Sequence, residues 1–184
     1  MTPAEFQKQI EAKIKKLNTA KLIYPIATAV HDAVVNRIFE VGIDGSDTKI
    51  GDYSTKESYF TRDQFHKKGA FKPQGKTSKK RKKENGEDRT SMYLPQGYKE
   101  LRKIQGDESD FVNLSYTRDL RKDFSTKLSI RNGVVVAQVN RAINASKIEW
   151  LTAKYGAKTF LHTDEEKEFY QEEVANALTE YFNT

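Results

Sequence analysis

The chain has 184 residues, 36% of them apolar and 32% charged, a composition that fits a single domain over residues 1–184. Ten Phe, nine Tyr and one Trp can fill one compact core. No run approaches the roughly 18 apolar residues of a membrane-spanning helix, so no membrane partner is expected. The lack of cysteine excludes disulfides, thiolate metal sites and cysteine nucleophiles.

The net charge of +6 is unevenly distributed along the chain. Residues 61–90 hold eleven Lys or Arg against four Asp or Glu, a net +7, whereas residues 163–184 hold seven acidic residues and one Lys, a net −6. A chain with one basic and one acidic segment has two surfaces of opposite charge. Such surfaces can serve nucleic-acid binding, or head-to-tail contact between copies.

Two amphipathic helices are expected at the N-terminus. Thr2-Pro3-Ala4-Glu5 is a capping-box pattern with Pro at the first helical position, and apolar residues follow at helical spacing as far as Leu17. A second helix is expected from Ile23 to Val41, where an apolar residue recurs every four positions. Gly42 stands where a left-handed C-cap is needed.

The middle of the chain is expected to be less regular. Residues 42–53 are rich in Gly, Asp and Ser, which predicts turns. Residues 55–92 carry too many charges to build a core, which predicts a long, flexible basic loop or a hairpin arm. Pro95 to Ile104 predicts a short helix that Gly106 ends, and Tyr116 to Leu120 predicts a further turn or two of helix.

The clearest β signal lies between Phe124 and Asn140. Asn132-Gly133 is the favoured pair for a two-residue type I′ turn. The register that follows pairs Ile130 with Val135, Leu128 with Ala137, and Thr126 with Val139, with the apolar members on one face. The expected fold is therefore α+β, with amphipathic helices packed on a small antiparallel sheet built round this central hairpin, plus the long basic loop.

The C-terminal part is expected to be mainly helical. Ser146-Lys147-Ile148-Glu149 is a second capping-box pattern, opening a helix that runs to Tyr155. Thr159-Phe160-Leu161 could form a short strand. Thr163-Asp164-Glu165-Glu166 is a third capping box, and the helix behind it has one apolar face, formed by Tyr170, Val174, Leu178 and Tyr181.

No pattern of residues predicts catalysis. Residues 69–77 resemble a phosphate-binding loop, but five residues separate the two glycines where the motif needs four. The three histidines, His31, His66 and His162, have no ligand partners at fixed spacing, and the turn at Asp44 lacks the acidic pattern of a calcium loop. We therefore expect no enzyme, no cofactor and no metal.

The basic run is the candidate contact site for a partner or for nucleic acid. Its members are Lys76, Lys79, Lys80, Arg81, Lys82 and Lys83. Three interpretations stay open: a solvated loop, a patch that neutralises phosphates, and a nuclear-import signal. Tyr93 and Tyr98 could stack on bases, although their apolar neighbours favour packing instead.

Three segments, taken together, resemble a known family. They are Arg37 to Ser54, Gly97 to Gly106, and Val112 to Leu120, the last containing Asn113-Leu114-Ser115-Tyr116-Thr117. In this order they are similar to virion-morphogenesis proteins of tailed bacteriophages, the small neck, head–tail joining and tail-completion components. The resemblance covers roughly residues 30–140. Many relatives have Gly directly after the threonine of the third segment, where this chain has Arg118, and residues 61–90 have no clear counterpart.

The resemblance implies a virion protein without catalytic activity, made in the cytoplasm of a host bacterium. Copies of such a protein form a ring around the channel through which DNA leaves the capsid. The implied partners are other copies of the chain, the portal or connector, and tail proteins, with packaged DNA as a non-specific contact. The alternative is a stand-alone basic nucleic-acid-binding protein.

Overall fold

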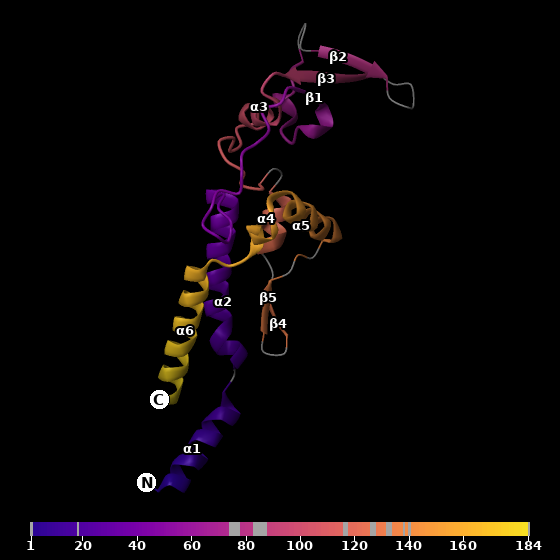
Figure 1. The fold of residues 1–184 in the computed structure, drawn as a ribbon. Coiled ribbons are helices and arrows are strands. Elements are labelled where there is room, and N and C mark those ends of the chain that lie inside the picture. The colour runs from indigo at the N-terminus through magenta and orange to yellow at the C-terminus, as the bar shows by residue number, and fades with distance from the viewer. Residues whose placement is uncertain are drawn as a thin grey trace.

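The computed structural model of the chain describes residues 2–17, 19–73, 78–82, 88–115, 118–125, 128–131, 134–137, 139 and 141–183 (Figure 1). The fold is α+β. Its longer helices are α1 (Pro3–Lys16), α2 (Thr19–Asn36), α3 (Gly97–Ile104), α4 (Asp119–Ser125), α5 (Ala142–Tyr155) and α6 (Asp164–Asn183). Its strands are β1 (Ser58–Thr61), β2 (Ser78–Lys82), β3 (Asp88–Leu94), β4 (Leu128–Arg131) and β5 (Val134–Ala137). Short helical turns are η1 (Arg37–Val41), η2 (Arg62–Gln64), η3 (Lys68–Ala70) and η5 (Ala157–Phe160).

Helix α2 is the centre of the larger part of the molecule. It packs along α6 on one side and contacts α4, β4 and β5 on the other (Figure 1). It continues into the π-helical turn η1 and ends at Gly42, whose φ of 75° is the left-handed conformation expected of a C-cap. A Cβ at Gly42 would lie 2.3 Å from the Phe111 ring, so both conformation and space require glycine.

The main hydrophobic core forms between α2, α4 and α5. Ile38, Phe39 and Val112 are fully buried in it, and Phe124 contributes a ring 5.9 Å from that of Phe39. Phe124 lies in α4, one turn after buried Leu120, so residues at this helical spacing share a face. The predictions of a helix over 116–120 and of a strand from Phe124 are therefore wrong in their boundaries.

The β4–β5 hairpin has the predicted register. Ile130 pairs with Val135 and Leu128 with Ala137 in an antiparallel ladder. The Asn132-Gly133 turn and the pairing partner Thr126 lie outside the described residues. Val139, beyond the second strand, packs against the main core.

A second sheet occupies the segment that was predicted to be a loop. Its three antiparallel strands follow the order β1-β3-β2, and β1 and β3 pack on α3. The core between them consists of Phe60, Phe65, Leu94 and Leu101, none more than 7% exposed. The loop interpretation of residues 55–92 is therefore wrong for β1 and its surroundings, because Phe60 and Phe65 of this charged segment are buried against Leu101 of α3. The alternative, a hairpin arm, is confirmed for β2 and β3.

Helix α1 extends away from the core (Figure 1). Its capping box is confirmed, with Thr2 N–H donating to Glu5 and Glu5 N–H donating to Thr2 Oγ1. No residue of α1 is buried, and Phe6 and Ile14 of its apolar stripe are more than half exposed. It is tied to the end of α6 by hydrogen bonds between Lys13 Nζ and the Phe182 carbonyl, and between Tyr181 Oη and the Lys13 carbonyl.

The start of α5 differs from its prediction. The helix begins at Ala142, so Ser146 lies inside it and is not an N-cap. The Asp123 carboxylate, from α4, instead accepts hydrogen bonds from the Arg141 N–H and from Asn144 Nδ2. A side chain distant in the sequence thus accepts a hydrogen bond at the N-terminus of α5, where the local capping box was expected to do so.

The C-terminal helix follows its prediction more closely. The third capping box is confirmed at α6, where Thr163 and Glu166 exchange backbone-to-side-chain hydrogen bonds. The short strand expected at 159–161 is wrong, because residues 157–160 form the 3-10 turn η5. Thr159, fully buried there, donates its hydroxyl to the Gly156 carbonyl.

Candidate functional site

Four of the six predicted basic contact residues lie on one strand of a projecting hairpin. We call β2 and β3 together the arm (Figure 1). Lys79, Lys80, Arg81 and Lys82 are four consecutive residues of β2. Opposite them on β3, Arg81 faces Arg89 and Lys82 faces Asp88 in the ladder. Lys76 and Lys83 lie outside the described residues.

A second basic region was not predicted: a cavity of about 730 Å³ between α5, α3, the segment before β1 and the loop after α3. Four cationic side chains line it, from Arg102, Arg118, Lys147 and Lys154. Four aromatic side chains line it too, from Tyr53, Tyr98, Trp150 and Tyr155. Asp52 is the acidic member of the lining, and its carboxylate is already paired with Lys49 at 2.6 Å.

The α5 wall of the cavity follows a helical repeat. Lys147, Trp150, Leu151 and Lys154 stand at positions i, i+3, i+4 and i+7, which places them on one face of the helix. The Lys154 ammonium lies 4.7 Å from the centre of the Trp150 ring and 5.0 Å from that of Tyr155. Trp150 is 58% exposed. This mixed basic and aromatic face was the signal in the sequence that could have revealed the cavity.

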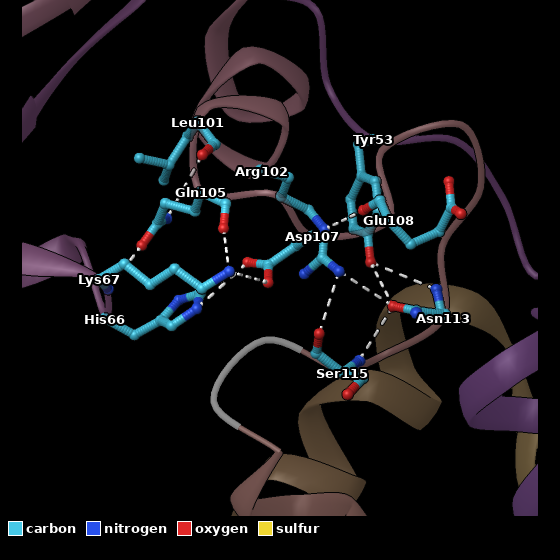
Figure 2. Close-up of polar contacts among 10 residues, drawn as sticks. All are labelled: Tyr53, His66, Lys67, Leu101, Arg102, Gln105, Asp107, Glu108, Asn113 and Ser115. Atoms are coloured by element: carbon cyan, nitrogen blue, oxygen red, sulfur yellow. Dashed lines mark hydrogen bonds and ion pairs between the residues drawn. The ribbon is translucent and has the colours of Figure 1, made fainter. Parts of the chain in front are cut away.

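Arg102 supplies a fixed positive charge to the cavity wall (Figure 2). Its side chain is almost fully buried, and its guanidinium donates to the Glu108 and Ser115 carbonyls and to Asn113 Oδ1. The guanidinium carbon lies 4.5 Å from the centre of the Tyr53 ring, a cation–π distance. Because each of these partners comes from the loops beside α3, the charge is held in one place.

Asn113 connects Arg102 to Tyr53 (Figure 2). Its Oδ1 accepts from the Tyr53 hydroxyl at 3.1 Å, and its N–H donates back to that hydroxyl at 3.2 Å. Burial raises the pKa of Tyr53, an effect that the Arg102 charge opposes. The phenol is therefore neutral at physiological pH and acts as a donor in the cavity wall.

A separate polar cluster lies at the C-terminal end of α3 (Figure 2). Lys67 donates its backbone N–H to Gln105 Oε1 at 3.1 Å and its ammonium to the Gln105 carbonyl. His66 Nε2 lies 3.5 Å from a carboxylate oxygen of Asp107, which is 12% exposed. These contacts fasten the loop after η2 to the end of α3, where Gly106 has a φ of 66°. Their role is to hold the small sheet and α3 together.

The remaining polar residues that the sequence singled out have structural roles. Buried His31 bonds the Phe124 carbonyl through Nε2 at 2.8 Å, and exposed His162 lies far from the other two histidines in sequence. Asp44 closes a plain turn: burial alone would raise its pKa, but hydrogen bonds from Ser46 and Thr48 lower it. Of the segment that resembles a phosphate-binding loop, residues 74–77 lie outside the described part of the chain.

Among the described residues, no group of three or more His, Asp or Glu side chains could hold a metal ion. Among the helices that the structure describes, none combines the length and the apolar character needed to cross a bilayer. Comparison with protein-family models, curated proteins and solved structures found no match.

Proposed function

We propose that the chain is a structural component of a tailed-phage virion, a neck or tail-completion protein whose copies form a ring joining the portal or connector to the tail. The observation that carries the proposal is the separation of charge in the fold. The acidic helix α6 lies apart from both basic regions, from strand β2 at the far end of the molecule and from the cavity beside α5 on the other side of α2 (Figure 1). Surfaces of opposite charge on different parts of one chain favour heterologous contacts, which close into rings when the rotation between copies divides a full turn.

The backbone at Arg118 supports the family resemblance on which the proposal also draws. Arg118 has a φ of 63°, in the left-handed region that glycine adopts at lower cost. Many of the phage proteins that the chain resembles have glycine at this point. The conformation is therefore the one that a glycine-bearing relative would need, although the side chain differs.

In this proposal the arm reaches a protein of the adjoining ring. A two-stranded arm with four consecutive cations on β2 suits a charged, sequence-independent contact with an acidic protein surface or with passing DNA. Proteins that read DNA sequence in the groove use a helix or ribbon that carries base-contacting side chains together with phosphate contacts. Four consecutive cations on β2 could also neutralise the phosphates of a nucleic acid. Stand-alone nucleic-acid binding is therefore the second candidate function.

Cryo-electron microscopy of purified virions of the encoding phage tests the proposal. The chain is expected in density at the capsid–tail junction, in several copies. Its absence from particles, with the protein found only in infected cells, would overturn the proposal. Reversing the charges at Lys79, Lys80, Arg81, Lys82 and Lys83 gives a second test: it should produce DNA-filled heads without tails, and normal particles would show that the arm makes no essential contact.

A further inference from the structure

We infer that the cavity receives the outer face of α6 from the next copy of the chain, with Phe169 as the anchor. The inference rests on the proposed ring and specifies its contact between copies. The cavity then has one occupant, a helix of the same protein, and the arm remains available to contact the adjoining ring.

The first argument is the division of α6 into two faces. Tyr170, Val174 and Leu178 are half-buried on the side that packs along α2. The opposite side is exposed and carries Glu165, Glu168 and Glu172 around the ring of Phe169, which is 47% exposed. Aromatic residues are enriched at protein–protein contacts, and here the carboxylates around Phe169 would form a negatively charged rim.

The second argument is the chemistry of the cavity. Its lining combines apolar and aromatic surface with the cations Arg118, Lys147 and Lys154. A phenyl ring fits the aromatic part, and glutamates one helical turn on either side of it would lie near the lysines. At about 730 Å³ the cavity has room for the side chains of one helical turn. The charges of the two surfaces are complementary, which favours this pairing over contact between like surfaces.

The third argument is where the two surfaces lie. Helix α6 packs on one side of α2, and α5 stands on the other (Figure 1). A helix on one side of the molecule can enter a cavity on the other side only in a different copy. When two copies have met in this way, one still has a free cavity and the other a free α6 face. This is the heterologous arrangement from which a ring is built.

Cross-linking tests the contact directly, because the chain has no cysteine of its own. A Glu168→Cys/Lys154→Cys chain treated with a short bismaleimide should give a ladder of trimers and larger species, whereas each single variant should stop at dimers. The matched control, Glu168→Cys/Lys8→Cys, pairs the same α6 position with an exposed lysine on α1 and should give no ladder. A ladder of equal yield from the control, or none from the test pair, would overturn the inference.

Fluorescence gives an independent measurement, since Trp150 is the sole tryptophan and borders the cavity. Its emission should shift as the protein concentration rises, and Phe169→Ala should raise the concentration of the half-maximal shift about tenfold. Phe6→Ala, which removes another exposed phenylalanine, should leave it unchanged. A shift caused by duplex DNA or ATP, with no response to protein concentration, would show that the cavity holds a different ligand and that the inference is wrong.

A charge swap completes the test. Glu168→Lys alone and Lys154→Glu alone should each weaken association roughly threefold, and the double variant should restore it. The two proposals fail separately. Virions with the chain at the capsid–tail junction but without the cross-linked ladder would overturn this contact alone, whereas a ladder formed by a chain absent from virions would overturn only the proposed place in the phage.

Discussion

The guanidinium of Arg37 holds the carboxylate of Glu166 through two hydrogen bonds, at 2.8 Å from Nε and 3.2 Å from Nη2, and so joins the end of α2 to the start of α6. The two side chains are 10% and 11% exposed. Arg37 also donates to the Ile43 and Leu161 carbonyls. One side chain thereby fixes the position of the acidic helix relative to the rest of the core.

The first prediction concerns this pair. Glu166→Gln should lower the free energy of unfolding by about 3 kcal/mol, because a buried guanidinium loses its counter-charge while the shape of the site is kept. Urea denaturation at neutral pH measures the change. Glu165→Gln, one residue earlier and exposed, is the control and should change stability by less than about 0.5 kcal/mol. Equal effects of the two substitutions would show that the pair contributes nothing specific.

The second prediction concerns Tyr53 and pH. Burial raises the pKa of its phenol in the folded chain above the unfolded value of about 10. The stability that comes from this difference is complete below that unfolded pKa and is lost as the pH rises through the folded pKa. Tyr53→Phe should cost about 1–2 kcal/mol at neutral pH, because Asn113 loses two hydrogen bonds.

The same variant should flatten the fall of stability under alkaline conditions, because it has no phenol to ionise. Urea denaturation at several pH values between about 8 and 11 measures this slope. Tyr24→Phe, at a tyrosine that is 45% exposed, is the control and should keep the slope of the parent chain. A Tyr53→Phe chain with the parent's alkaline slope would contradict the assignment.

The third prediction concerns Gly97, the first residue of α3. Its φ is 55°, and a Cβ there would lie 1.9 Å from the Lys56 carbonyl oxygen, which is backbone and cannot rotate away. Gly97→Ala should therefore destabilise the chain by more than about 3 kcal/mol. Thermal unfolding followed by circular dichroism measures it. Gly69→Ala, where no atom lies within 4 Å of the new Cβ, is the matched control and should melt close to the parent.

The fourth prediction concerns the arm and DNA. If the chain is a ring protein, duplex DNA should bind it weakly and without sequence preference. Replacing Lys79, Lys80, Arg81 and Lys82 by Gln should reduce the slope of log affinity against log salt by about 3–4, because each phosphate contact releases a counterion. Fluorescence anisotropy at several salt concentrations measures the slope.

The control for the arm removes the same charge elsewhere. Gln at Lys8, Lys15, Lys16 and Lys103, all exposed, should leave most of the salt slope intact. Equal slopes for both variants would show that net charge, not the arm, governs binding. Tight and sequence-selective binding at physiological salt would instead favour the stand-alone nucleic-acid-binding alternative.

The parts of the fold that the sequence predicted well are those determined by neighbouring residues. The Ile130–Val135 pairing follows from a two-residue turn and a period of two, which together allow one register. The capping boxes at Thr2 and Thr163 and the left-handed Gly42 likewise depend on a few adjacent positions. Each of these features could be checked within a single segment.

The parts that were missed depend on residues distant in the sequence. The start of α5 is set by Asp123, whose carboxylate accepts a hydrogen bond from the N–H of Arg141, eighteen residues later in the chain. The small sheet depends on Phe60 and Phe65 reaching Leu101 of α3, which the surrounding charges conceal. The cavity needs both α5 and the loops beside α3, so its basic and aromatic residues are brought together only by the fold.

Tyr98, near the start of α3, is common to the two hydrophobic cores. Its ring lies 5.5 Å from that of Tyr53 on one side and 6.5 Å from that of Phe60 on the other, and it packs against both clusters. Two small cores that share a ring lose packing together, because opening either one uncovers a surface of the other. The arm-bearing sheet and the helical core should therefore unfold cooperatively, and a force applied to the arm should reach the helices through this ring.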